Sequence, residues 1–354
     1  MGSKGRASDG GRTPTIYDVA AAAGVAPSTV SRTFSRPGRV NSETAQRIRA
    51  VADQLGYRIN PVARALSTSR TSLIAVVVAD IANPFFAAII RGVQAGAAQA
   101  GYTVLLIDSE ESETIEREAL IRALPLVDGV VLGSSRLSDS GIRTVAKQRP
   151  VVVVNRSVSG VPSVVIDNRG GVRTALEHLA GLGHQRLTYA AGPEASWPDG
   201  VRWRALRELA GDFGVRVHRR GPFAPTISGG LRAAEVVRQH PASAVIAYND
   251  QVAIGIMRRL TQLGARIPAN VSVIGFDNIL PAELVTPGLT TVEAPLYAQG
   301  KTAVGTLLAT IGSARPQAGR AVVLPTRLVV RESTAVPGAY DPATWQISGA
   351  GTGP

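Results

Sequence analysis

The chain has 354 residues, of which 45% are hydrophobic, and its 38 lysine and arginine residues outnumber its 26 aspartate and glutamate residues to give a formal net charge of +12. This length exceeds one typical domain, and the apolar fraction is enough to build sizeable cores. The sequence has no cysteine, which excludes disulfides and thiolate metal sites. It also lacks an apolar run of about 18 residues and an apolar signal-peptide core, so we expect a cytoplasmic protein without a membrane span.

The basic excess is concentrated in the first fifth of the chain. Residues 1–70 hold 11 basic and 4 acidic side chains, which favours a phosphate-binding surface there. We expect residues 1–12, a Gly/Ser-rich stretch, to be a disordered tail. A solvated basic tail does not explain Arg32, Arg39 and Arg64, which fall inside or between predicted ordered motifs.

The segment after this tail predicts two short helices joined by a sharp turn. Ile16 and Val19 have the spacing of one apolar helix face. Gly24 supplies the turn, and Pro27 falls in the first turn of the second helix, where its missing N–H costs nothing. Short polar side chains and Arg32 on the second helix suit phosphates and base edges in a major groove. The spacing alone also allows an ordinary surface helical hairpin.

A third helix is predicted after Val40, where Asn41 or Ser42 can cap it. Its apolar face consists of Ile48, Val51, Ala52 and Leu55. Three helices on a shared core make a compact headpiece, which we assign to residues 13–60. Residues 61–70 follow as a short hinge helix and linker, with Pro61 at a plausible first-turn position.

Strands and helices alternate after the linker. The run Leu73–Val78 is continuously apolar, as is typical of a strand buried on both faces. The predicted strands are 73–78, 103–107, 129–132, 151–154, 186–190, 215–218, 244–248 and 271–275, and the predicted helices are 85–100, 113–124, 141–148, 171–182, 201–213, 229–239 and 251–263. This order predicts two similar α/β lobes with parallel sheets and a cleft between them, over residues 71–337. A helix near 299–310 and a strand near 322–330 suggest repeated crossing between lobes, and 338–354 is expected to be a disordered tail.

These motifs resemble the lactose-repressor/galactose-repressor (LacI/GalR) family of bacterial transcription factors. The headpiece pattern is Tyr17-Asp18-Val19-Ala20, Gly24-Val25 and Thr29-Val30-Ser31-Arg32, and Val62-Ala63-Arg64-Ala65-Leu66 is similar to the family's hinge helix. Asp80, Asn83-Pro84-Phe85-Phe86, Asn155-Arg156, Gly192-Pro193, Asn249-Asp250 and Val273–Asn278 are similar to the regulatory-domain signatures. The resemblance covers roughly residues 13–333 and implies an all-α helix-turn-helix headpiece plus a two-lobed, periplasmic-binding-protein-like α/β domain.

The resemblance also implies a transcriptional regulator, expected to be a repressor, that acts as a homodimer or a dimer of dimers on a near-palindromic double-stranded operator. Ser28 and Arg32 are predicted to carry most polar base readout, and Leu66 is predicted to wedge into the minor groove, with Arg64 as the alternative. The predicted DNA-contacting residues are Thr15, Tyr17, Pro27, Ser28, Thr29, Ser31, Arg32, Arg39, Asn41, Thr44, Asn60, Ala63, Arg64 and Leu66.

A small-molecule effector, expected to be a carbohydrate or related metabolite, is predicted to bind between the lobes. Side chains that follow predicted strands meet at the carboxyl edge of such sheets, where carboxylates and amides suit sugar hydroxyls. Trp197 is predicted to lie in a loop at the cleft, and Asp250 is predicted to cap the following helix rather than to bind ligand. The predicted effector-binding residues are Asp80, Phe86, Arg156, Ser196, Trp197, Arg202, Asn249 and Asp277.

Two other classes of protein have folds of this kind, a solute-binding protein and an enzyme. A solute-binding protein would share the two-lobed fold, but it should carry an export signal and no basic headpiece. An enzyme on a doubly wound fold should show a nucleophile elbow, a metal-binding histidine pair or a phosphate loop, and the four scattered histidines form no such motif. We therefore expect no catalytic residue, no metal and no cofactor, whereas the identity of the effector and the operator stays open.

Overall fold

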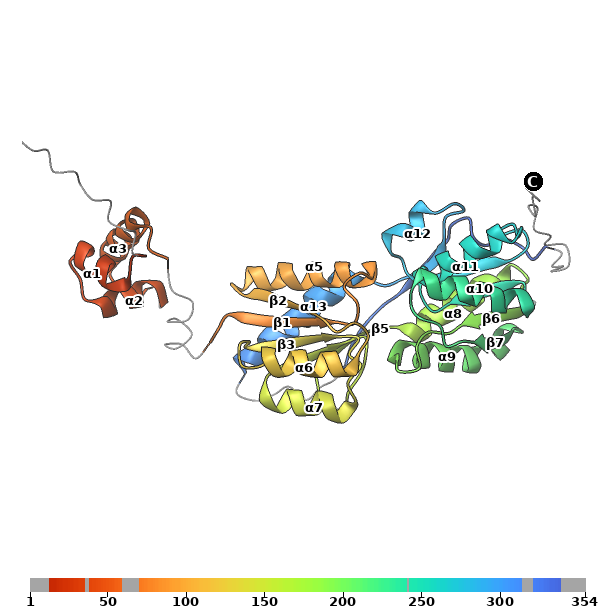
Figure 1. Ribbon diagram of the computed structural model, residues 1–354, viewed down its shortest axis with the longest axis horizontal. Helices are drawn as coiled ribbons and strands as arrows, with labels where there is room; N and C mark the ends of the chain where they lie inside the picture. The colour runs from red at the N-terminus through yellow and green to blue at the C-terminus, as the bar shows by residue number, and fades with distance from the viewer. Residues whose placement is uncertain (1–12, 36–37, 59–69, 241, 314–320, 339–354) are drawn as a thin grey trace, which may run out of the picture. The chain divides into compact units, whose positions relative to one another are not determined.

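The computed structural model describes residues 13–35, 38–58, 70–240, 242–313 and 321–338. It comprises two compact units, Met1–Ser72 and Leu73–Pro354, each of which is described by itself (Figure 1). The predicted hinge residues Ala63, Arg64 and Leu66, together with Asn60 and both predicted tails, lie outside the described residues apart from Gly338.

The first unit contains the predicted headpiece. Its helices are α1 (Ile16–Ala23), α2 (Pro27–Ser35) and α3 (Ser42–Leu55). Val19, Val30 and Ile48, one from each helix, are fully buried in a shared core. Gly24 ends α1 with φ at 65°, the left-handed conformation that glycine adopts without strain. Asn41 caps α3 by accepting a hydrogen bond from the backbone N of Glu43 at 2.9 Å. The predicted helix-turn-helix is confirmed. Of the two predicted caps of α3, Asn41 and Ser42, Asn41 is the one observed.

The first lobe of the second unit is a six-stranded sheet in the order β11-β5-β4-β3-β1-β2, and every pairing is parallel. The strands are β1 (Leu73–Val78), β2 (Thr103–Asp108), β3 (Gly129–Gly133), β4 (Val151–Val154), β5 (Ser163–Ile166) and β11 (Val322–Leu324). The helices are α5 (Pro84–Gln99), α6 (Glu113–Ala123), α7 (Asp139–Gln148) and α13 (Leu296–Gly312). The apolar side chains of α5 and α13 cover one face, and those of α6 and α7 cover the other (Figure 1).

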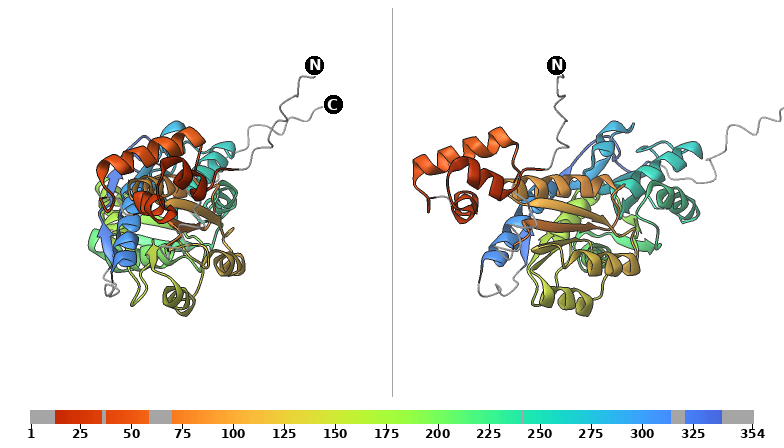
Figure 2. Two further views of the ribbon diagram at one scale, coloured as in Figure 1. Left: turned by 90° about the vertical axis from the view of Figure 1, so that its left-hand side faces the viewer. Right: turned by 60° about the vertical axis from the view of Figure 1, so that its left-hand side comes forward.

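The second lobe has a matching six-stranded sheet, β12-β10-β9-β8-β6-β7. The strands are β6 (Arg186–Ala190), β7 (Arg216–Arg220), β8 (Ala244–Ala247), β9 (Ser272–Asp277), β10 (Thr290–Glu293) and β12 (Arg327–Val329). The helices are α8 (Asn168–Gly181), α9 (Trp197–Leu209) with the 3-10 turn η1 (Ala210–Phe213), α10 (Ile227–Gln239), α11 (Asp250–Gln262) and α12 (Leu280–Leu284). Helices cover both faces of each sheet (Figure 2). Only the β10–β12 pairing is antiparallel among the described strands.

The chain crosses between the lobes three times. It leaves the first lobe after β5, returns with α13 and β11, and crosses again to β12. The single strand predicted near 322–330 is therefore wrong in detail, because β11 and β12 belong to different sheets. Pro325 stands between them and has no backbone N–H to continue a ladder.

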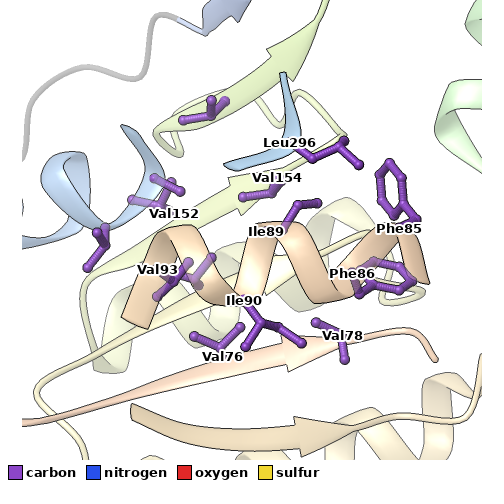
Figure 3. Close-up of a cluster of buried hydrophobic side chains, with 14 of the residues drawn as sticks. Val76, Val78, Phe85, Phe86, Ile89, Ile90, Val93, Val152, Val154 and Leu296 are labelled. Carbon is purple, nitrogen blue, oxygen red and sulfur yellow. The ribbon is translucent and has the colours of Figure 1, made fainter. Parts of the chain in front are cut away.

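Helices α5 and α13 approach each other closely because glycine lies at their contact. A Cβ added to Gly300 of α13 would lie 2.1 Å from the carbonyl oxygen of Ile89, and one added to Gly92 would lie 2.1 Å from that of Tyr297. Ile89 and its neighbours on α5 pack into the core that Figure 3 shows. The backbone of each helix thus fills the space where a side chain of the other would stand.

We predict opposite effects for two alanine substitutions in α13. Gly300→Ala forces the two backbones apart and should lower the free energy of unfolding by about 1–3 kcal/mol, the usual cost of overpacking. Gly305→Ala places its Cβ in open space and should raise the free energy of unfolding by about 0.5–1 kcal/mol. Urea titrations followed by circular dichroism measure both, and equal stabilities for the two variants would contradict this account of the helix contact.

Candidate functional site

The headpiece presents polar side chains beside a buried helix face. Ser28 and Arg32 of α2 are exposed, whereas Val30 and Thr33 of the same helix are buried. Tyr17 of α1 is 70% exposed, although its ring is large and partly apolar. Such an exposed aromatic next to a basic helix is available for contact with another molecule.

Some of the predicted DNA-contacting residues also have local structural roles. The backbone N of Thr15 donates to Asp18 Oδ2 at 2.7 Å as part of a capping box at the start of α1, and the Thr15 hydroxyl donates to the same oxygen at 2.7 Å. The backbone carbonyls of Thr29 and Ser31 accept hydrogen bonds from hydroxyls one turn later. Of the remaining predicted contacts, Pro27 and Thr44 are half-buried, while Arg39 and Asn41 are exposed.

A cleft lies between the two lobes at the carboxyl ends of their strands, where open α/β sheets bind ligands. Its lining from the first lobe is Asn83, Phe85, Phe86, Glu111, Ser134, Arg136 and Asn155, and its lining from the second lobe is Pro198, Arg202, Pro225, Tyr248, Asn249 and Asp277. The cavity that these residues line has a volume of about 30 Å³. Ser134, Asn155 and Asp277 have φ values of 57°, 64° and 108°, in a region that residues other than glycine rarely adopt. Such backbone outliers concentrate at functional sites.

Arg202 is the central cation of the second-lobe wall. Its side chain extends from α9 and is 3% exposed. Nε donates to Asn168 Oδ1 at 2.8 Å, and Nη1 donates to the carbonyl oxygen of Tyr248. Nη2 lies 3.7 Å from Asp277 Oδ1, and the guanidinium carbon lies 4.1 Å from the ring centroid of Phe276. The guanidinium is therefore both paired and stacked.

Two buried carboxyls lie behind and beside this arginine. Burial raises the pKa of Asp277 to about 7, although the Arg202 guanidinium opposes the shift. Burial and the neighbouring Asp277 raise the pKa of Asp250 well above its usual range. Asp250 accepts hydrogen bonds from the backbone N of Ile279 at 2.8 Å and from the Thr291 hydroxyl at 2.5 Å.

The predicted cap at Asp250 is wrong by one residue. Asn249 caps α11, since its Oδ1 accepts from the backbone N of Val252 at 2.9 Å, and its Nδ2 donates to Pro225 O at 3.1 Å. Asn249 also lines the cleft. Asp250 instead ties the start of α11 to the segment after β9, so its role is structural.

The loop predicted around Trp197 is also wrong. α9 begins at Trp197, with proline in the first turn and Ser196 as N-cap, whose hydroxyl oxygen accepts from the backbone N of Asp199. Serine, proline and aspartate in this order form a helix start. Pro198 reaches the cleft, whereas Trp197 does not line it. The Ser196 hydroxyl forms a hydrogen bond of 2.8 Å with the Tyr248 hydroxyl.

Two further predicted residues lie away from the cleft lining. Asp80 accepts from the backbone N of Ala82 at 2.8 Å and shapes the turn before α5. Arg156 donates to Leu137 O at 2.6 Å and to Asp139 at 2.5 Å, so its guanidinium fastens the loop that enters α7. The predicted residues that the structure brings together at the cleft are Phe86, Arg202, Asn249 and Asp277.

Several residues that line the cleft were not predicted from the sequence as effector-binding residues. Ser134 and Arg136 directly follow the predicted strand at 129–132, and that position was the signal that could have found them. Asn155 donates from Nδ2 to the Ser134 hydroxyl at 3.1 Å and accepts from Gln299 Nε2 at 2.9 Å. Gln299 comes from α13, so no local pattern indicates this contact.

The described residues include no group of three or more histidine, cysteine, aspartate or glutamate side chains placed to hold a metal ion. None of the described helices combines the length and apolarity needed to cross a membrane. His184 is buried and bonds through its two ring nitrogens to Ser243 Oγ and Ala335 O, as expected for a structural residue.

Comparison with known proteins finds similarity along nearly the whole chain. Residues 15–60 match the family model described as bacterial regulatory proteins, lacI family, and residues 176–334 match the periplasmic binding protein-like domain. The ribose operon repressor of Halalkalibacterium halodurans is 33% identical over 90% of this chain and 97% of its own length. The transcriptional repressor CytR of Escherichia coli is 31% identical over 90% of this chain and 96% of its own length.

Solved structures give the same picture. The lac repressor dimer bound to operator and the anti-inducer ONPF has a TM-score of 0.82 and 27% identity, over 92% of this chain and all of that chain. A LacI family transcriptional regulator from Enterococcus faecium with bound ribose has a TM-score of 0.66 and 30% identity, over 75% of this chain and 99% of that chain.

The raised pKa of Asp277, about 7, predicts a specific pH dependence of stability. The unfolded chain releases this proton near pH 3.9, so between about pH 4 and 7 the folded state binds more protons and the free energy of unfolding falls as pH rises. Asp277→Asn should remove this pH-dependent contribution to the free energy of unfolding, which is of the order of a few kcal/mol. The free energy of unfolding of the variant should therefore change less between about pH 4 and 7. Urea unfolding at several pH values measures it. The exposed Asp212→Asn is the control, and parallel slopes for Asp277→Asn and the parent would contradict the prediction.

Proposed function

Because the chain belongs to the lacI family of bacterial regulatory proteins, we propose that it represses transcription by binding operator DNA with an affinity set by an effector in the interlobe cleft. One observation carries the proposal: an exposed helix-turn-helix surface and a cleft built around buried Arg202 occur in one chain. The relatives are transcriptional regulators rather than enzymes. A solute-binding protein, the alternative with the same two-lobed fold, would have no use for the headpiece.

Base readout is assigned to the exposed face of α2. Ser28 and Arg32 are exposed on this helix, and arginine is the best bidentate reader of guanine. Tyr17, Thr29 and Ser31 are assigned to phosphates, together with the N-terminus of α1 at Thr15. The hinge roles of Leu66 and Arg64 remain predictions from the sequence.

The effector is assigned to the carbohydrates. Structural neighbours carry ribose or cellobiose, and the cleft here offers Phe86 as an apolar face with amide, hydroxyl and carboxylate groups around it. A cavity of about 30 Å³ has room for two or three water molecules, since each needs about 10–15 Å³. Sugar binding therefore requires a wider spacing of the lobes, and this requirement links the effector to a change in conformation.

A homodimer completes the proposal. A single headpiece buries too little surface for tight specific binding, whereas two headpieces read a near-palindromic operator. The second lobe exposes large apolar side chains on two helices: Ile227 of α10 is 40% exposed, and Leu280 and Leu284 of α12 are 68% and 71% exposed. The relative with the highest TM-score quoted above is a dimer on operator. We assign these side chains to the subunit interface.

Arg32→Ala should weaken specific operator binding by about 1–3 kcal/mol, the value of a bidentate contact to guanine, and leave non-specific DNA binding nearly unchanged. Fluorescence anisotropy on operator and scrambled duplexes measures both. Arg143→Ala, an exposed arginine of the first lobe, removes the same charge outside the headpiece and should change neither affinity. Equal losses on the two duplexes would instead make Arg32 a phosphate contact.

Arg202→Lys should weaken effector binding by at least about tenfold, because an ammonium cannot replace the fork that bonds Asn168 and Tyr248 while facing Asp277, and each bond to a charged group is worth about 1.5–3 kcal/mol. Calorimetry with a panel of sugars, and operator binding with and without them, measure the change. The matched control is the exposed Arg204→Lys on the same helix. A full effector response in Arg202→Lys would remove Arg202 from the site.

A further inference from the structure

The first-lobe wall of the cleft carries an ion pair that the assignments above leave unused. Glu111 follows β2 in a turn where its φ is 59°, and Arg136 follows β3. Both side chains line the cleft. Nε of Arg136 donates to Glu111 Oε2 at 2.7 Å, and Nη2 of the same guanidinium donates to the same oxygen.

Hydrogen bonds donated by the backbone N of both residues hold this ion pair in place, in addition to the contact between the two side chains. The backbone N of Arg136 donates to Oε2 of the buried Glu116 at 2.7 Å, and the backbone N of Glu111 donates to Ala79 O at 2.6 Å. The Arg136 side chain is 7% exposed and that of Glu111 is 30% exposed. The two charges therefore belong to the wall of the cleft rather than to a solvated surface.

A guanidinium buried to this extent requires a counter-ion, since an unpaired buried charge is strongly unfavourable. An effector with a phosphate group would supply that counter-ion itself. Here Glu111 already does, so a phosphate beside Arg136 would be repelled by Glu111 from a similar distance, and the two Coulomb terms largely cancel. A hydroxyl has no such conflict, because it accepts from the guanidinium and donates to the carboxylate.

The second-lobe wall of the cleft likewise pairs a cation with a carboxyl group. Arg202 faces Asp277 at 3.7 Å. Among the described residues that line the cleft, two cations are balanced by two carboxyl groups, and the other polar groups are amides and hydroxyls. This balance suits an uncharged ligand.

We propose that Glu111 is a specificity determinant that, as the resident counter-ion of Arg136, selects uncharged hydroxyl-rich effectors and rejects their phosphate esters. The proposal rests on the proposed function only in placing the effector in this cleft.

Glu111→Gln tests this directly, because glutamine keeps the shape and an acceptor oxygen but removes the charge. The probes are ribose, glucose and galactose with their monophosphate esters, titrated calorimetrically at about pH 8, where Asp277, with a pKa of about 7, is ionised. The parent should bind at least one neutral sugar and bind its ester at least tenfold more weakly. Glu111→Gln should change the ratio of the two affinities by at least tenfold in favour of the ester, because one nearby negative charge is removed.

Two other variants make the test specific. Glu110→Gln changes the same charge at the adjacent exposed residue, outside the cleft lining, and should leave the ratio unchanged. Arg136→Gln leaves the Glu111 carboxylate without its cation and should weaken binding of the ester further relative to the neutral sugar. The proposal therefore stays testable even if circular dichroism shows that Glu111→Gln fails to fold.

Four results would overturn the proposal: a parent that prefers an ester, a ratio unmoved by Glu111→Gln, an equal shift in Glu110→Gln, or binding of neither class. Operator binding is measured separately. A chain that discriminates the probes but ignores operator DNA refutes only the repressor function, whereas a repressor controlled by a sugar phosphate refutes only the role of Glu111.

Discussion

The burial of one cation organises the second-lobe wall of the cleft. A guanidinium that is 3% exposed must have all its charge compensated within the protein. Arg202 meets this need through contacts with three segments: Asn168 at the start of α8, the Tyr248 carbonyl after β8, and Asp277 with Phe276 at the end of β9. These contacts fix the strand ends relative to α9, so the polar groups that face the cleft are positioned before any ligand arrives.

The crossing segments determine how the opposite wall can move. Asp167, just after β5, accepts through its carbonyl from the Thr326 hydroxyl at 3.0 Å, and its backbone N donates to Leu324 O at 2.8 Å. Two of the three crossings are therefore bonded to each other. Gln299 lies just after the remaining crossing, between β10 and α13, and bonds to Asn155 of the cleft. Short contacts thus connect the crossing segments with each other and with a residue of the cleft.

The sequence allowed most of the fold to be predicted, because long buried strands and capped helices leave local patterns. β1 and β6 were predicted at their observed bounds, and Asn41 was recognised as a possible cap. The four-residue strands β5 and β10 were not predicted, since so short a run carries little periodicity. The site was harder to predict: a position after a strand does not fix the direction of its side chain. Asp80 and Arg156 were therefore expected in the cleft but bond to backbone and neighbouring groups instead.

The same paired charges limit what an effector can gain. Arg136 and Arg202 already have protein partners, so a ligand at either one exchanges hydrogen bonds with the protein rather than only adding new ones. Its influence on operator binding cannot exceed its difference in affinity between two lobe arrangements. On the proposal that the effector is a sugar, the cavity of about 30 Å³ is too small to hold it at this spacing of the walls, so steric exclusion would dominate that difference. Packing would then supply the energetic coupling, and the charge balance at the two ion pairs would select the ligand.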